Sequence, residues 1–141
     1  MFHSGKILAI DFGRKSIGLA VSDEDRQMAF GRGVFQCKNG LAQAIGMVNK
    51  FCVQENIKEI VVGLPYGQEG EETPQTARIR RFAQALEEAL PKIPIHFQDE
   101  SFTSFEANEF LDIIGVKARN RKKSEDELAA VFILKRYLKL N

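Results

Sequence analysis

Three acidic residues stand out because of the segments that surround them. Asp11 closes the apolar run 7–10, Glu100 follows the short apolar segment 95–98, and Asp126 precedes the last apolar stretch of the chain. If Asp11 and Glu100 meet, their charges repel unless a cation or a shared proton relieves them. An all-oxygen set without His or Cys favours Mg²⁺ or Mn²⁺. Two such ions roughly 3.5–4 Å apart activate water and stabilise the leaving oxygen of a phosphodiester.

Each acid also has a purely structural explanation. Asp11 is suited to a turn before Gly13, and Glu100 to a solvated strand end. Asp126 is suited to the first turn of a helix, where the helix dipole stabilises an acid by roughly 0.3–1 kcal/mol. Thr103 is expected to cap a helix, although its hydroxyl can also position a phosphate. Residue types alone therefore leave the chemistry open.

A basic run lies between the second and third acids. The net charge is only +1, so the local distribution is more informative than the sum. We interpret residues 115–123 as a loop that holds a polyanion against the repulsion of nearby carboxylates. A generic charged loop is the alternative. The cations of this run are Lys117, Arg119, Arg121, Lys122 and Lys123.

The elements that must position these residues follow from periodicity and turn signals. Alternating or continuous apolar runs predict strands, and apolar residues at helical spacing predict helices. Predicted strands cover 6–12, 16–22, 28–36, 57–62 and 95–98; predicted helices cover 41–55, 73–90 and 103–113, with a last one from 124. Gly31 and Gly33 either weaken the third strand or mark a bulge in it.

The predicted fold class is α/β, with a five-stranded mixed sheet of three antiparallel and then two parallel strands, and helices on both faces. Ligands collect at the carboxyl ends of parallel strands. Asp11, Gly63 and Glu100 are therefore expected at one edge. The segment Ser124–Glu127 has capping-box form and predicts the start of the last helix. Its expected inward stripe is Leu128, Val131, Phe132, Lys135 and Leu138.

Composition is that of an ordinary globular chain. The 141 residues, 44% hydrophobic and 28% charged, predict a single domain over 1–141. Apolar runs are shorter than the roughly 20 residues of a membrane helix, and the first residues lack a secretory signal. Cys37 and Cys52 are expected to be reduced, buried thiols of a cytoplasmic protein. Monomer and homodimer remain open.

Four blocks in order resemble the motifs of the YqgF/RuvX family. They are residues 10–18 with 21–23, Val62-Gly63-Leu64-Pro65 with Gly70, residues 99–104, and residues 126–130. Family members have an RNase H-like fold and are described as Holliday junction resolvases or as nucleases that mature the 5′ end of pre-16S rRNA.

The resemblance implies that Asp11, Glu100 and Asp126 are catalytic and bind the metal. We assign substrate contacts to Arg14, Lys15, Thr103, Arg119, Arg121, Lys122 and Lys123. Three positions depart from the family pattern. Family members often have a basic residue where this chain has Ser16 and a polar residue where it has Gly67. They usually have a small residue where this chain has Glu127. Glu127 is then a spare ligand or a capping acid.

The leading hypothesis is a nuclease that uses Mg²⁺ or Mn²⁺, with two ions, on structured nucleic acid, and an rRNA precursor is favoured over a DNA junction. A second hypothesis is a nucleic-acid-binding assembly factor without catalysis. A third arises because residues 11–16 also resemble a phosphate loop of actin-like ATPases, which pair two such domains where this chain offers one. No membrane partner is expected.

Overall fold

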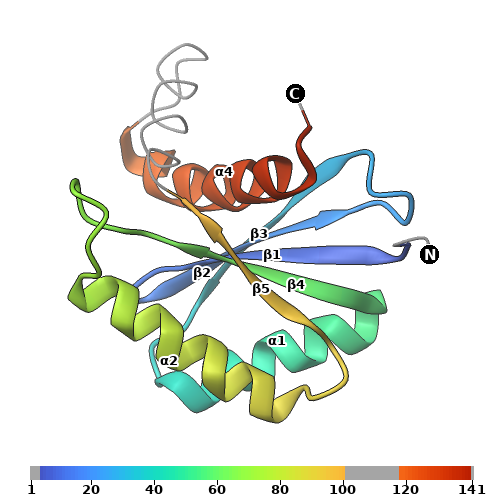
Figure 1. Ribbon diagram of the computed structural model, residues 1–141, viewed down its shortest axis with the longest axis horizontal. Helices are drawn as coiled ribbons and strands as arrows, with labels where there is room; N and C mark the ends of the chain where they lie inside the picture. The colour runs from blue at the N-terminus through green and yellow to red at the C-terminus, as the bar shows by residue number, and fades with distance from the viewer. Residues whose placement is uncertain (1–3, 101–117, 141) are drawn as a thin grey trace.

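The computed structural model describes residues 4–100 and 118–140, and within these it describes 118–124 by backbone alone. The elements follow one another as three strands and then alternating helices and strands (Figure 1). They are β1 (Lys6–Phe12), β2 (Ser16–Ser22), β3 (Ala29–Gln36), α1 (Leu41–Glu55), β4 (Ile57–Leu64), α2 (Pro74–Ala89), β5 (Ile95–Asp99) and α4 (Ala118–Leu138).

The five strands form one mixed sheet in the order β3-β2-β1-β4-β5, which confirms the predicted fold class. β1 pairs antiparallel with β2, and β2 with β3, whereas β4 runs parallel to β1 and to β5. β1 is thus the central strand. The register of β2 and β3 shifts between Gly18 and Ala20, and Gly33 has a φ of +91°, so the predicted bulge is present.

Helices cover both faces of the sheet: α1 and α2 lie on one face and α4 on the other (Figure 1). Successive side chains of a strand point to opposite faces. Leu8, Ile10 and Phe12 accordingly enter the core beneath α1 and α2. Ile7 and Ala9 enter the smaller core beneath α4, so Asp11 falls on the α4 side by the same alternation.

Two parallel strands are longer than predicted. β4 continues through Gly63 and Leu64, which pair with Gln98 and Asp99 of β5. The sequence predicted that the strand ends before Gly63 because a glycine and a proline lie close together in Gly63-Leu64-Pro65. Only the proline ends the strand, since it has no N–H to donate. The longer strands bring Glu100 level with the end of β4.

Helix α2 begins as predicted. The Thr73 hydroxyl accepts a hydrogen bond from the Thr76 N–H over 3.2 Å, and Pro74 occupies the first helical position. Ile79, Phe82, Ala83 and Leu86 face the core. The helix predicted for 103–113 lies outside the described residues.

The start of the last helix was predicted wrongly. α4 begins at Ala118, so residues 118–123 are helical instead of part of a basic loop, and Ser124 does not cap the helix. The physical reason is that alanine, arginine and lysine are good helix formers, and no Gly or Pro separates them from the apolar residues that follow.

The inward stripe of α4 also differs from the prediction. Its buried side chains are Ala129, Ala130, Ile133 and Leu134, whereas Leu128, Val131, Phe132, Lys135 and Leu138 are half-buried. Small alanines face the sheet because the helix backbone lies close to β2.

Both cysteines are free thiols, as predicted, but only Cys52 is buried; Cys37 is half-buried. Among the described residues, none of the helices combines the length and apolar character needed to cross a bilayer.

Candidate active site

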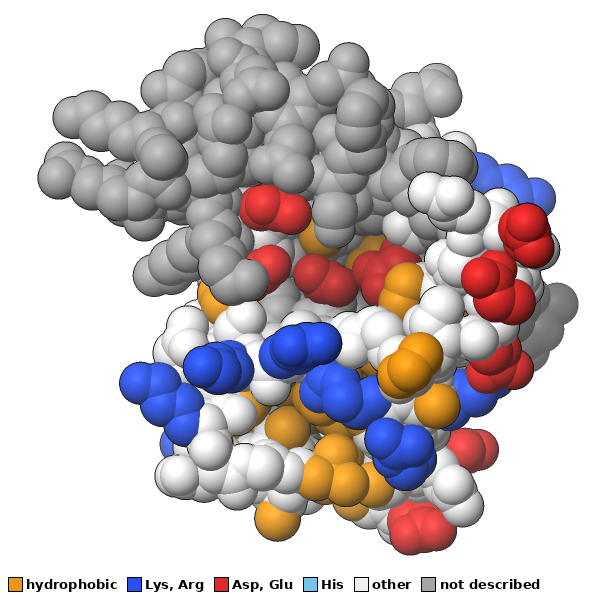
Figure 2. Space-filling model, turned by 90° about the vertical axis from the view of Figure 1, so that its left-hand side faces the viewer, with side chains coloured by type: hydrophobic (Ala, Val, Ile, Leu, Met, Phe, Trp, Pro, Cys, Tyr) orange, Lys and Arg blue, Asp and Glu red, His pale blue; other side chains and the backbone are white. Residues whose placement is uncertain are grey.

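Asp11 and Glu100 meet at the carboxyl edge of the parallel strands. Asp11 lies opposite Gly18 of β2, and the Glu100 N–H donates to the Leu64 carbonyl over 3.3 Å at the end of β4. Their partly buried side chains share a hydrogen bond. Figure 2 shows acidic side chains gathered in a hollow at this end of the sheet, with a row of Lys and Arg below it. The predicted convergence of Asp11, Gly63 and Glu100 agrees with this arrangement.

The surroundings of the pair disfavour its fully charged form. Burial, followed by the charge of Glu100, raises the pKa of Asp11 well above its ordinary value, and Asp126 and Glu125 add to the effect. Burial also raises the pKa of Glu100; the hydrogen bond with Asp11 opposes this rise, and the charge of Asp99 adds to it. Two such groups share one proton unless a cation is present to replace it.

Asp126 approaches the pair from α4. Its Oδ2 accepts a hydrogen bond from the Ser16 hydroxyl over 3.0 Å. Asp126 lies in the third turn of α4, counting from Ala118, and the helix dipole acts only within the first turn. The dipole explanation for this acid is therefore wrong.

Two glycines make the arrangement sterically possible. A Cβ at Gly18 would lie 2.2 Å from the Asp126 carbonyl oxygen, so glycine allows α4 to touch β2 beside Asp11. A Cβ at Gly63 would lie 2.4 Å from Ile133 Cδ1 and 2.8 Å from Glu100 Oε2. The role of Gly18 was missed from the sequence, although its position opposite Asp11 across a predicted hairpin was a usable signal.

The donor set fits a hard divalent cation in its chemistry. Asp11 and Glu100 offer only oxygen atoms, and burial, followed for Asp11 by the charge of Glu100, raises their pKa values, a cost that a bound cation would offset. In the part of the chain that the structure describes, no three His, Cys, Asp or Glu side chains are grouped closely enough to hold one ion. Asp126 would have to exchange its Ser16 contact, or share its second oxygen, to join the pair.

The contact that Glu127 makes differs from both roles proposed from the sequence, a spare metal ligand and a capping acid. Its Oε2 accepts a hydrogen bond from the Gly33 N–H over 2.6 Å at the bulge of β3. The residue thus fastens α4 to the edge strand. Neither a helix cap nor a place beside the Asp11–Glu100 pair describes it.

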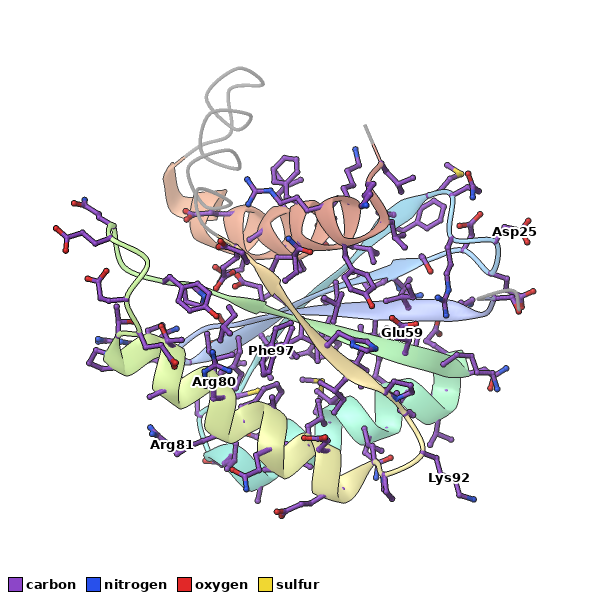
Figure 3. All side chains as sticks on the ribbon, viewed as in Figure 1. Asp25, Glu59, Arg80, Arg81, Lys92 and Phe97 are labelled. Atoms are coloured by element: carbon purple, nitrogen blue, oxygen red, sulfur yellow. The ribbon has the colours of Figure 1, made fainter. Side chains whose placement is uncertain are left out.

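Glu59 provides a contrast within the same sheet. It is 8% exposed, and its Oε1 lies 3.0 Å from Arg26 Nη1, while its Oε2 accepts from the Tyr137 hydroxyl. Figure 3 shows Glu59 on β4, away from the loop that follows this strand. A buried acid paired with a cation is a structural element, whereas an acid paired with another acid is typical of a functional site.

Of the basic residues predicted to contact substrate, the structure describes the side chains of Arg14 and Lys15. Arg14 and Lys15 are exposed in the turn between β1 and β2, beside the acidic edge. Arg14 also lines a cavity together with Arg78 and Arg81 of α2. The predicted contact Thr103 and the side chains of Arg119, Arg121, Lys122 and Lys123 lie outside the described residues.

Comparison with known proteins agrees with this geometry. The family model "RuvX: Holliday junction resolvase" matches residues 5–140. The chain is 38% identical to the "Putative pre-16S rRNA nuclease" of Maridesulfovibrio salexigens over 94% of this chain and 97% of that one. It is 40% identical to the protein of the same name from Koribacter versatilis, over 95% and 86%.

A solved structure shares the fold. T. thermophilus RuvC, determined with a Holliday junction substrate, aligns with a TM-score of 0.59 at 14% identity, covering 95% of this chain and 94% of that one. The sheet order, the helices on both faces and this likeness identify an RNase H-like fold. The family match and the full-length similarity to these relatives place the chain in the RuvX family.

Proposed function

We propose that this protein is a metal-dependent endonuclease that cleaves phosphodiester bonds in structured RNA, and that its reaction is 5′ processing of pre-16S rRNA. The observation that carries the proposal is the Asp11–Glu100 pair, two acids in hydrogen-bond contact at the carboxyl edge of the sheet. Membership of the RuvX family supports a nuclease, and the names of the relatives favour the rRNA precursor.

The metal site would be formed by Asp11, Glu100 and Asp126, with Mg²⁺ or Mn²⁺ as the ion. When bound, such an ion supplies Lewis acidity toward a phosphate and lowers the pKa of water. The chain's own residues prepare the site. Ser16 orients the Asp126 carboxylate, and Gly18 and Gly63 leave room for the acids to approach.

The substrate would lie across the edge that carries these acids. Arg14 and Lys15 are exposed next to Asp11 and would contact backbone phosphates. We assign further phosphate contacts to Arg119, Arg121, Lys122, Lys123 and Thr103. In this proposal the whole of residues 1–141 acts as one nuclease domain.

A DNA junction is the second candidate substrate. The description of the RuvX family as Holliday junction resolvases favours it. The chemistry at Asp11 and Glu100 would be the same for both nucleic acids, so the carboxylate geometry does not discriminate between them. A protein that binds nucleic acid without cleaving it is the third possibility.

A cleavage panel tests the proposal. Precursor 16S rRNA and four-way DNA junctions are incubated with the full chain in Mg²⁺, Mn²⁺ or EDTA. We expect metal-dependent cleavage of the RNA that Asp11→Asn abolishes. Asp25→Asn is the matched control, because Asp25 is exposed in the turn between β2 and β3, at the other end of the sheet (Figure 3). Full activity of Asp11→Asn would refute the catalytic assignment, and cleavage of junctions alone would select the DNA substrate.

A further inference from the structure

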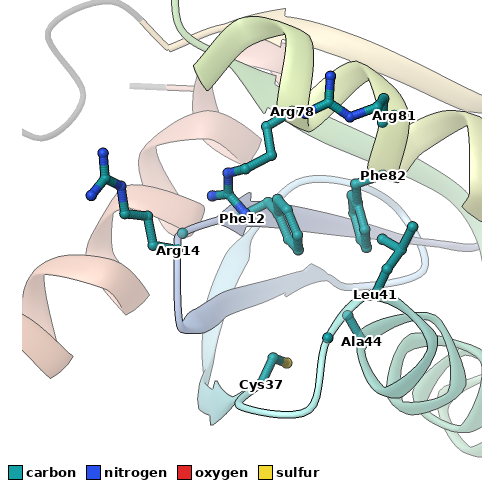
Figure 4. Close-up of a pocket in the computed structure, with 10 residues that line it drawn as sticks. Phe12, Arg14, Cys37, Leu41, Ala44, Arg78, Arg81 and Phe82 are labelled. Carbon is teal, nitrogen blue, oxygen red and sulfur yellow. The ribbon is translucent and has the colours of Figure 1, made fainter. Parts of the chain in front are cut away.

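A cavity of about 220 Å³ lies beneath the turn between β1 and β2, on the α1 and α2 side of the sheet. Phe12, Leu41 and Phe82 are among its apolar walls, and Arg14, Arg78 and Arg81 supply its charge (Figure 4). Phe12 follows Asp11 directly, and neighbouring side chains of a strand point to opposite faces. The cavity and the acidic pair therefore share one edge of the sheet but open on opposite faces.

The described lining of this cavity carries positive charge only. None of the described residues that line it is acidic. Arg78 Nη2 is fully buried and has no hydrogen-bond partner among the described residues. Burial lowers the pKa of Arg78, and the positive charges of Arg14 and Arg81 lower it further. A buried cationic donor without an acceptor is costly, and an anion beside the guanidinium would offset the positive charge of Arg78.

The Arg78 guanidinium is held in position with this donor unused. Its Nε donates to Gln75 Oε1 over 3.2 Å, and its central carbon lies 4.5 Å from the centre of the Phe12 ring. The Phe12 ring is in turn stacked on Phe82, with 4.1 Å between centroids. Figure 4 shows the three side chains in a row, guanidinium, Phe12 and Phe82. A fixed guanidinium loses little entropy when it binds an oxyanion.

Helix α2 adds positive potential at the same place. An adjoining hollow is lined by Arg14, Pro74, Gln75 and Arg78, so the first turn of α2 lies beside both arginines. The N-terminus of a helix carries a partial positive charge. Guanidinium groups and a helix N-terminus are both suited to phosphate.

We propose that the cavity is a phosphate-binding subsite that takes a nucleotide, with the phosphate on Arg78, Arg14 and Arg81 and the sugar or base on the apolar wall formed by Leu41 and Ala44. The phosphate belongs to the nucleic-acid strand or to a free nucleoside monophosphate. The first source rests on the function proposed above, because one strand crossing the sheet edge would then place one phosphate at the acids and another here. Figure 2 shows a row of Lys and Arg side chains on this side of the molecule, with apolar side chains exposed below it.

Cys37 provides a built-in reporter, because it lines the cavity and is half-buried. Cys52 is buried, and burial raises its pKa to about 12, so it stays unreactive. Alkylation of Cys37 by iodoacetamide is followed by mass spectrometry in EDTA. The full chain is measured alone, with AMP, with inorganic phosphate, and with a short single-stranded RNA lacking a terminal phosphate. Binding of the RNA is titrated against salt in parallel.

We expect ligand to slow the alkylation of Cys37 about tenfold at a concentration roughly ten times its Kd, since only the empty fraction reacts. Arg78→Gln and the exposed Arg81→Gln should each remove this protection. If the strand supplies the phosphate, each substitution should also reduce the steepness of the plot of log binding constant against log salt concentration by about 0.7. Lys92→Gln removes the same charge from the exposed turn between α2 and β5 and should change neither quantity (Figure 3).

The outcomes separate the possibilities. Protection by RNA identifies strand phosphate, and protection by AMP or inorganic phosphate without protection by RNA identifies a free ligand. Unchanged alkylation with all three ligands, or unchanged protection in Arg81→Gln and Arg78→Gln, overturns the subsite. Because the assay needs no metal and no cleavage, its failure beside intact RNA cleavage rejects the subsite alone. Intact protection without any cleavage rejects the nuclease proposal alone.

Discussion

The Ser16 hydroxyl donates a hydrogen bond to Asp126 Oδ2 over 3.0 Å and joins β2 to α4 across 110 positions of the sequence. This contact restrains a carboxylate of α4 whose charge contributes to the raised pKa of Asp11. Ser16, one of the departures that the resemblance indicated, thus contacts an acid of α4.

Ser16→Ala should therefore weaken metal binding, with little loss in the free energy of unfolding. Loss of a group that orients a metal ligand typically costs 10–100-fold in metal affinity or activity. We expect the Mg²⁺ concentration for half-maximal cleavage to rise by about tenfold. The matched control is Ser22→Ala, at the other end of β2, where the hydroxyl is buried and accepts from the Ile7 N–H over 2.9 Å. That variant should lose stability and keep its Mg²⁺ requirement; the same Mg²⁺ requirement in both variants would contradict the orienting role.

Gly18→Ala should separate α4 from β2. The new methyl group would lie 2.2 Å from the Asp126 carbonyl oxygen, so the helix must move. Overpacking of this kind costs about 1–3 kcal/mol in the free energy of unfolding, and cleavage should fall with it. Urea unfolding and a cleavage assay measure the two effects. Gly46→Ala in α1 is the control, since nothing lies within 4 Å of its Cβ position and the change should stabilise by roughly 0.5–1 kcal/mol. A fully stable and active Gly18→Ala would show that the close approach is dispensable.

The raised pKa of Asp11 predicts a pH-dependent stability in EDTA. The folded protein keeps a proton on the Asp11–Glu100 pair that the unfolded chain has released, so the native state binds more protons. The free energy of unfolding should thus fall as the pH rises from the ordinary aspartate value of 3.8 through the raised value. Mg²⁺ or Mn²⁺ should restore stability at the upper end of this range, measured as Tm. In Asp11→Asn the pH effect should shrink and the metal effect should disappear. If the metal raised the Tm of Asp11→Asn as much as that of the unaltered protein, the ion would have to bind at a site without Asp11.

Glu127→Ala should lower stability without altering metal dependence. Its carboxylate accepts from the Gly33 N–H over 2.6 Å, and a hydrogen bond to a charged group contributes about 1.5–3 kcal/mol. The partly exposed position puts the expected loss near the lower end of that range. Glu88→Ala, on the exposed side of α2, serves as control. A changed Mg²⁺ requirement in Glu127→Ala would instead support the ligand role.

Local signals sufficed for most of the fold. The apolar run before Asp11, the helical spacing over 41–55 and the Thr73-Pro74 start each depend on neighbours within a few residues, and each agrees with the structure. The start of α4 was wrong because a capping box at 124 is also compatible with the middle of a longer helix. Helix propensity upstream decided between the two.

By itself, the sequence determined the mixed five-stranded sheet, its coverage by helices on both faces and the family, because periodicity and ordered motifs are properties of the chain. It also located Asp11 and Glu100 at strand ends, whose meeting follows from parallel pairing. Tertiary structure alone decided that Ser16 contacts Asp126, that Gly18 admits α4, and that Arg78 has a buried donor without an acceptor among the described residues. These depend on distances between elements far apart in the chain, and such distances are set by how side chains pack between the layers.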